Sequence, residues 1–360
     1  GWLALGGVAL LQTSCNAMAT THFDQFLPDW NPMLQGMLSN NCSSELATYK
    51  TGERPPNTKF SVLITPVIDC ILENLPEHRK MEIGASAVVL GLLPTILSAL
   101  GSTPAETALV HLRRPLLAML LAIGSPSVII MKTSDYKRFT DDLVKEFAKE
   151  LHPDPRDSAT AAAVAPLIAW KHMASRPRRI ALSIVQYLVV LAAVGNVMSL
   201  WYQLGFHAIV SWAPETIFMV PLWSSICVVL HFGAVWIQSL RLRMWSVGDG
   251  HETSKGTSAS QQLRRFFGRC AEEYTPSAFQ EQRKIRWRGD SAFVNFLIWL
   301  LCIGAVINLI FGSMIFSSLL FFSVQDVLLI ATRYLVSTIV CRGVSRMELI
   351  GAKECTTFHE

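Results

Sequence analysis

Long runs of hydrophobic residues, separated by polar and often basic connections, form the main pattern of this chain. The longest run lies between Asp290 and Asp326, where 35 consecutive residues carry no formal charge. A helix that crosses the hydrocarbon core of a bilayer needs roughly 20 apolar residues, so this run is long enough for two crossings. We therefore expect a hairpin of two membrane helices over residues 291–341, with a turn near Gly312-Ser313.

Three other hydrophobic segments have the length of a membrane helix. They cover residues 82–100, 180–202 and 217–240, and the second contains no charge. Trp201 and Tyr202 lie where an interfacial aromatic belt is expected. The pattern predicts an all-α, polytopic helical membrane protein with five transmembrane helices.

Residues 105–131 contain two shorter apolar runs. The sequence TPAE at residues 103–106 resembles a helix N-cap with proline in the first turn, and Arg113-Arg114-Pro115 interrupts the segment. Two adjacent arginines would be costly at mid-bilayer. We expect an interfacial or re-entrant helical elbow in which both arginines extend toward the lipid headgroups. The alternative is one kinked crossing, which gives six transmembrane helices and places the N-terminus inside.

The basic residues have an uneven distribution that predicts the topology. Residues 132–179 and 241–290 each contain ten of the 31 lysines and arginines, whereas residues 203–216 and 312–325 contain none. Basic connections stay on the cytoplasmic side of a membrane. With five crossings, the N-terminus is extracytoplasmic and the C-terminus is cytoplasmic.

These patterns divide the chain into consecutive regions. They are an extracytoplasmic N-terminal region (1–81), a first transmembrane helix with the elbow (82–131), a basic cytoplasmic loop (132–179), a transmembrane hairpin (180–240), a second basic loop (241–290), a second hairpin (291–341) and a cytoplasmic tail (342–360). Within the loops we expect short helices over 141–151 and 159–170, a tether over 246–260 and a basic amphipathic helix over 263–273.

The N-terminal region has cysteines and a modification motif. We expect one disulfide among Cys15, Cys42 and Cys70 if this region is extracytoplasmic. The triplet that begins at Asn41 fits the N-glycosylation acceptor pattern. Prolines and asparagines indicate loop structure in the middle of the region. The apolar patch at residues 1–11 is either the end of a signal peptide's apolar core or a short helix lying on the membrane.

Asp326 and Arg333 are the formal charges that we expect at membrane depth. Seven residues separate them, about 10 Å along a helix axis, which is too far for a direct ion pair. Each therefore needs another partner, because an isolated charge in lipid is expensive. One interpretation is a proton or ion pathway, and the other is a structural polar network that fixes helix packing.

Several uncharged or weakly basic side chains in the predicted helices are possible partners. The intramembrane polar site comprises Asp326, Arg333, Gln325, Asn308, Asn295 and His231, and further possible partners are Gln186, Asn196 and Gln238. A histidine at membrane depth is either a proton relay or a hydrogen-bonded core residue.

Basic residues beside the membrane are candidates for binding anionic headgroups or simply for anchoring the protein. They are Arg113, Arg114, Arg283, Lys284, Arg286 and Arg288.

The composition and the absence of motifs argue against a soluble protein, a metal-binding protein and an enzyme. The chain is 51% hydrophobic and 16% charged, whereas about a quarter of the residues of a soluble protein are charged. Its cysteines form no C-x-x-C pair, and no G-x-S-x-G or H-E-x-x-H enzyme motif occurs. We expect no catalytic residue, metal, cofactor or nucleic-acid partner. The expected partners are membrane lipids and further copies of the chain.

The sequence LGLLPTIL at residues 90–97, followed by RRPLL at 113–117, resembles a family of multi-pass membrane proteins abundant in filamentous fungi. The sequence GSP at 124–126 fits the family too, as does the segment from FSS at 316–318 through Gln325-Asp326 to Arg333-Tyr334. The similarity covers roughly residues 70–130 and 290–350. The family has no established activity, so the resemblance implies a fungal plasma membrane or endomembrane and a shared architecture, without a mechanism.

Two functional hypotheses follow. The first is a channel- or transporter-like protein with a polar path through Asp326 and Arg333. The second is a structural membrane scaffold that binds anionic lipid and self-associates through small-residue helix faces, such as that of Gly84, Ala87 and Gly91. A path requires a hydrated cavity that reaches Asp326, whereas a scaffold buries this side chain without water.

Overall fold

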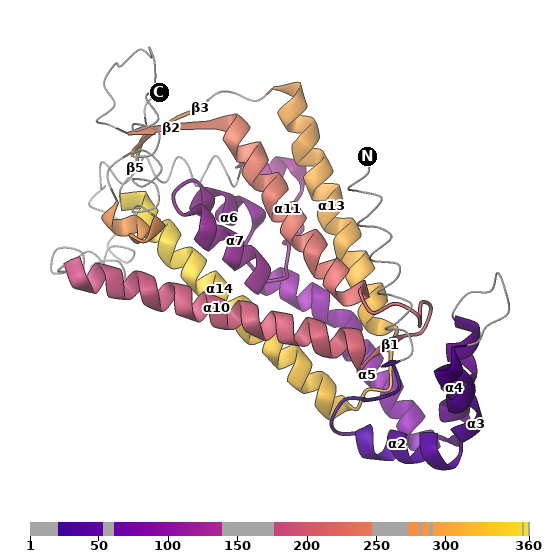
Figure 1. Ribbon diagram of the computed structural model, residues 1–360. Helices are drawn as coiled ribbons and strands as arrows, with labels where there is room; N and C mark the ends of the chain where they lie inside the picture. Colours follow the sequence, from indigo (N-terminus) through magenta and orange to yellow (C-terminus); the bar gives the residue numbers. More distant parts are fainter. Residues whose placement is uncertain are drawn as a thin grey trace. The chain divides into compact units, whose positions relative to one another are not determined.

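A computed structural model of the chain confirms the prediction of an all-α, polytopic helical protein. It describes residues 21–52, 61–138, 176–246, 273–280, 283–287, 291–354 and 356–358. Five of the described helices are long and apolar enough to cross a membrane. They are α5 (Glu77–Leu100), α10 (Arg176–Phe206), α11 (Met219–Arg241), α13 (Ala292–Ser317) and α14 (Val324–Glu354) (Figure 1).

Several predicted elements of the basic loops fall outside the described residues. These are the helices over 141–151 and 159–170, and nearly all of the tether over 246–260 and of the amphipathic helix over 263–273.

The chain forms two compact units. The first contains Gly1–Leu97, Asn196–Ser225 and Asn308–Leu335, and the second contains Ser98–Gly195, Ile226–Ile307 and Val336–Glu360. Each of the five long helices contributes residues to both units.

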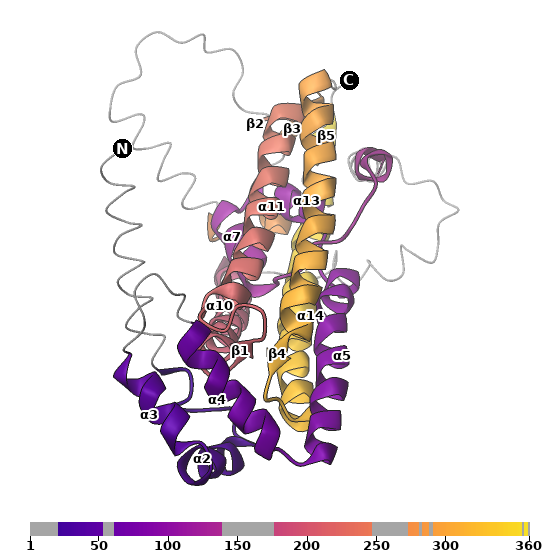
Figure 2. The same cartoon turned by 90° about the vertical axis from the view of Figure 1, so that its right-hand side faces the viewer.

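In the first unit, helices α2 (Asn31–Asn40), α3 (Ser43–Thr51) and α4 (Ser61–Asn74) lie together (Figures 1 and 2). We call the described residues 21–52 and 61–75 the N-terminal cap. The prediction of loop structure holds at Pro28 and Asn41, which lie in turns, but is wrong at Pro32, which lies in the first turn of α2, where its fixed φ favours a helix. The cap also has its own apolar core, which includes Trp30, Leu34, Tyr49 and Ile64.

A disulfide joins Cys42, just before α3, to Cys70 in α4. The prediction of one disulfide among the first three cysteines is therefore confirmed. Cys15 lies outside the described residues.

The cap packs against the two connections that contain no lysine or arginine, residues 203–216 and 312–325. Ile209 and Phe321 belong to its apolar core, and the rings of Phe26 and Phe321 meet edge to face, 5.9 Å apart. The same connections carry β1 (Ile209–Val210) and β4 (Leu319–Leu320), which pair antiparallel. The cap and both connections thus pack together within the first unit.

The turn of the second hairpin lies later than predicted. Helix α13 continues to Ser317, and the turn follows with Phe321 at a positive φ of 64°. Gly312 is helical, and a Cβ at this position would overlap the indole of Trp223. The glycine therefore permits close packing between helices and does not form the turn.

In the second unit, two short helices, α6 (Pro104–His111) and α7 (Pro115–Gly124), pack together and form the predicted elbow. A capping box begins α6: the Thr103 side chain accepts a hydrogen bond from the Glu106 amide, and the Glu106 carboxylate accepts one from the Thr103 amide. Neither helix is long enough to span a membrane.

A small sheet also belongs to the second unit. Strand β3 (Arg283–Trp287) pairs antiparallel with β2 (Leu242–Ser246) and parallel with β5 (Thr356–Phe358). The backbone of Arg283, Lys284 and Arg286 therefore lies on a strand, whereas Arg288 falls outside the described residues.

Candidate functional site

The interruption between α6 and α7 directs Arg114 into the protein interior. Its side chain is 0% exposed, and Arg113 is also buried. The expectation that these arginines extend toward lipid headgroups is wrong. A buried guanidinium is tolerated only where protein groups replace its water, and Arg114 has such groups.

Four hydrogen bonds hold the Arg114 guanidinium. Nη1 donates to Glu348 Oε1 at 2.8 Å and to Gln186 Oε1 at 2.6 Å. Nη2 donates to Ser183 Oγ at 2.7 Å, and Nε donates to the backbone carbonyl of Glu273 at 2.9 Å. The bond to Glu348 is a buried ion pair, since the two side chains are 0% and 2% exposed.

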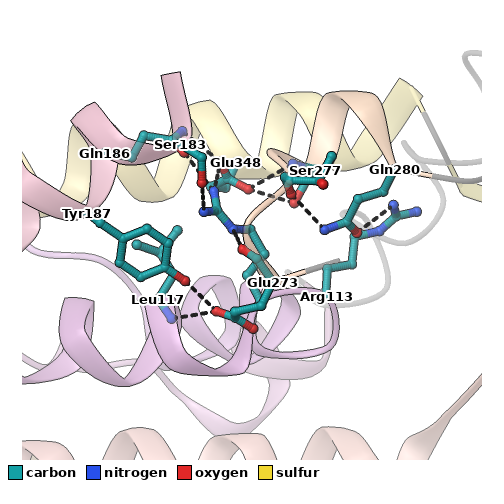
Figure 3. A network of polar contacts seen from close by, with 11 residues as sticks. Arg113, Leu117, Ser183, Gln186, Tyr187, Glu273, Ser277, Gln280 and Glu348 are labelled. Carbon is teal, nitrogen blue, oxygen red and sulfur yellow. Dashed lines mark hydrogen bonds and ion pairs between the residues drawn. The ribbon is translucent and has the colours of Figure 1, made fainter. Parts of the chain in front are cut away.

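The Glu348 carboxylate has donors on both oxygens (Figure 3). Gln186 Nε2 donates to Oε1 at 2.7 Å, while the backbone amide and hydroxyl of Ser277 donate to Oε2 at 3.1 and 2.6 Å. Ser277 belongs to η2 (Ser277–Phe279) in the second basic loop. This loop and α14 are thus joined through one carboxylate.

A second carboxylate anchors the start of α7 (Figure 3). Glu273 Oε1 accepts hydrogen bonds from the Leu117 amide at 3.0 Å and from the Tyr187 hydroxyl at 2.6 Å. Arg113 Nη1 donates to Gln280 Oε1 at 3.4 Å. We call the set around Arg114 the arginine–glutamate network. Its bonds connect the elbow, α10, the second loop and α14, and its partners are protein groups.

In the first unit, Arg333 of α14 has a different set of partners, which all lie on α10. Nε donates to Asn196 Oδ1 at 2.8 Å, Nη1 to Gln203 Oε1 at 2.7 Å, and Nη2 to Ser199 Oγ at 3.1 Å. In return, Asn196 Nδ2 donates to the Arg333 carbonyl at 3.0 Å. The prediction that Arg333 needs a partner other than Asp326 agrees with these bonds, and Asn196 was among the possible partners.

Asp326 lies in the first turn of α14. Its amide donates to Ser323 Oγ at 3.0 Å, and its carboxylate accepts a hydrogen bond from the Asp29 amide. Glu82 Oε1 accepts from the Val324 amide at 3.1 Å. These groups satisfy the free amides of a helix N-terminus and place negative charge there, where the helix dipole favours it.

Of the two interpretations of Asp326, these contacts agree with the structural polar network. The side chain is 5% exposed beside the cap. The sequence contains a signal for this arrangement. Ser323 and Asp326 form an S-x-x-D pattern before an apolar run, which is typical of a helix start.

The remaining predicted site residues are His231, Asn295, Asn308 and Gln325. His231 belongs to the second unit, where its Nε2 lies 3.1 Å from the Ser127 carbonyl and its Nδ1 lies 2.7 Å from Thr107 Oγ1. Because a carbonyl only accepts, Nε2 carries a proton. Asn295 belongs to the second unit, Asn308 is buried in the first, and Gln325 is exposed.

Small cavities adjoin His231 and Tyr136 in the second unit. Each measures about 10 Å³, which is space for about one water molecule. Their linings include neither Asp326 nor Arg333. Among the residues that the structure describes, no group of three or more histidine, cysteine, aspartate or glutamate side chains has the geometry to hold a metal ion.

The candidate glycosylation site, Asn41, is exposed beside the disulfide, and its Nδ2 donates to Asn74 Oδ1 at 2.6 Å.

Comparisons of the chain with protein-family models, curated proteins and solved structures found no match.

Proposed function

We propose that this protein is a structural membrane scaffold that binds anionic lipid and self-associates. The observation that supports this role is the arginine–glutamate network, in which buried charges are neutralised by protein groups. Such a network holds helices and loops in one arrangement. The basic segment from Arg283 to Arg288, next to α13, is a candidate for attracting anionic headgroups.

A channel- or transporter-like function is the second candidate. The observation that favours it is Arg333, a cation whose partners Asn196, Ser199 and Gln203 are all neutral. A charge of this kind can attract a permeating anion. The capping role of Asp326 argues against its participation in such a path.

Flux measurements separate the two candidates. Liposomes that contain folded wild-type protein are expected to show the same ion conductance and proton flux as protein-free liposomes. Flux that Arg333→Gln abolishes, and that Asp326→Asn leaves intact, would overturn the scaffold proposal. Chemical cross-linking in native membranes tests self-association, which predicts a ladder of discrete oligomers.

The proposal includes an extracytoplasmic N-terminal region in a fungal plasma membrane or endomembrane, with a glycan on Asn41. The disulfide supports an oxidising compartment for the cap. The test is the electrophoretic mobility of the wild type and of Asn41→Gln before and after endoglycosidase. A mobility shift in the wild type alone is expected, and equal mobility in all samples would argue against this orientation.

A further inference from the structure

Arg333 lies at an outward-facing seam between α10 and α14 in the first unit. One turn away on its own helix, Leu329 and Val336 are 59% and 54% exposed. Across the seam on α10, Ser199 is exposed and Tyr202 is 59% exposed. Helix surfaces of this kind face lipid in a membrane protein, so the guanidinium is accessible from the bilayer.

The charge of Arg333 has no counterion among the described residues. Its acceptors are the side chains of Asn196, Ser199 and Gln203 and the Asn196 carbonyl, all of them neutral. Arg114, the buried arginine of the second unit, has the Glu348 carboxylate. A cation in a low-dielectric surrounding is costly without an anion. The seam therefore lacks one negative group.

The position of the guanidinium indicates which anion can reach it. Arg333 follows Val324, the first residue of α14, by nine residues (333 − 324), roughly 13 Å of helix. Helical side chains lean toward the N-terminus of their helix. Nη1 accordingly reaches Gln203, within the last turn of α10. The charge thus extends toward the membrane surface on which both helices meet the cap connections, where lipid phosphates lie.

We propose that Arg333, together with Ser199 and Gln203, binds the phosphate of an anionic phospholipid. The guanidinium makes four hydrogen bonds and has five N–H groups, so one remains for the lipid. The Ser199 hydroxyl and the Gln203 amide are further donors. Charge-assisted hydrogen bonds to phosphate are short and strong. This site rests on the lipid-binding part of the proposed scaffold role and is distinct from the basic segment from Arg283 to Arg288.

The experiment measures lipid retention by the full chain. Wild-type protein is reconstituted into nanodiscs of phosphatidylcholine with phosphatidylglycerol, extracted, and analysed by native mass spectrometry. We expect retained phosphatidylglycerol in the wild type and roughly tenfold less in Arg333→Gln, because a hydrogen bond between charged groups is lost. Arg346→Gln is the matched control, since it removes an equal charge from an exposed position of α14.

Two results would overturn the proposal: equal retention by the wild type and Arg333→Gln, or an equal loss in Arg346→Gln. If Arg333→Gln does not fold, Ser199→Ala replaces it. We then expect several-fold weaker retention of phosphatidylglycerol, and unchanged retention would contradict the site.

A separate arm adds millimolar inorganic phosphate to protein in phosphatidylcholine alone. Thermal stabilisation by inorganic phosphate without phosphatidylglycerol retention would identify a soluble anion and overturn the lipid assignment. Ion flux is not a readout here, so failure of this test and failure of the scaffold proposal are distinguishable.

Discussion

The guanidinium of Arg114 donates a hydrogen bond to the carboxylate of Glu348 at 2.8 Å, although 234 residues separate them in the chain. Both side chains are buried, at 0% and 2% exposure. The pair therefore joins the elbow to the last turns of α14. Removal of one partner leaves an uncompensated charge in the interior, which is the most costly change that such a pair can undergo.

We predict that Arg114→Ala lowers the free energy of unfolding by about 3–5 kcal/mol, because Glu348 then remains buried and unpaired. Thermal unfolding in detergent measures the loss. The double variant Arg114→Met with Glu348→Leu should recover most of it, since it removes both charges. Lys80→Ala is the control, because it breaks the exposed pair with Glu77 and should cost less than about 1 kcal/mol.

Gly312 provides a test of helix packing in the first unit. An added Cβ would overlap the Trp223 indole, so Gly312→Ala should destabilise the protein by about 1–3 kcal/mol. Gly343→Ala is the matched control, because a Cβ there meets no atom within 4 Å. In that helix interior, alanine should be neutral or stabilising by up to about 1 kcal/mol. Equal unfolding temperatures for the two variants would contradict the packing around Gly312.

The cap should lose stability in mild acid. Burial lowers the pKa of His22 from 6.5 to about 4, so the unfolded cap binds this proton at a higher pH than the folded cap. The contribution of His22 to the free energy of unfolding is therefore fully present above about pH 6.5. It decreases as the pH falls toward 4, and the total loss is on the order of 3 kcal/mol. Hydrogen exchange of cap peptides from pH 7 to 4 measures this slope.

His22→Gln should flatten the slope, because glutamine does not titrate in this range. His78→Gln, at an exposed position near the start of α5, should retain the wild-type slope. A steep slope in His22→Gln would assign the acid sensitivity to another group.

Reduction of the cap disulfide should also destabilise α3 and α4. Cys42 and Cys70 are 28 residues apart, and loop-closure entropy for that length gives roughly 3–4 kcal/mol. The variant with Cys42→Ala and Cys70→Ala should show faster hydrogen exchange in the cap than the wild type. Cys302→Ala, which removes a free cysteine, is the control. Unchanged exchange in the double variant would show that the apolar core alone holds the cap.

The candidate sites were predictable only in part. The need of Arg333 for a polar partner followed from the cost of a charge in lipid. Asn196 was among the possible partners because it lies within a predicted membrane helix. Glu348 was missed because the membrane helix was expected to end at residue 341, whereas α14 continues to Glu354. Glu273 was missed because its partners, Leu117 and Tyr187, lie in other segments of the chain.

The sequence by itself determined the all-α membrane architecture, the break at Arg113-Arg114 and the helix start at Thr103. Each of these depends on the length of an apolar run or on neighbouring residues, which the order of residues records directly. Only the tertiary structure decided that Arg114 is buried, that Asp326 caps a helix, and that the cap has its own core. These features depend on which distant segments meet, because a buried charge or apolar face is stable only when another part of the chain satisfies it.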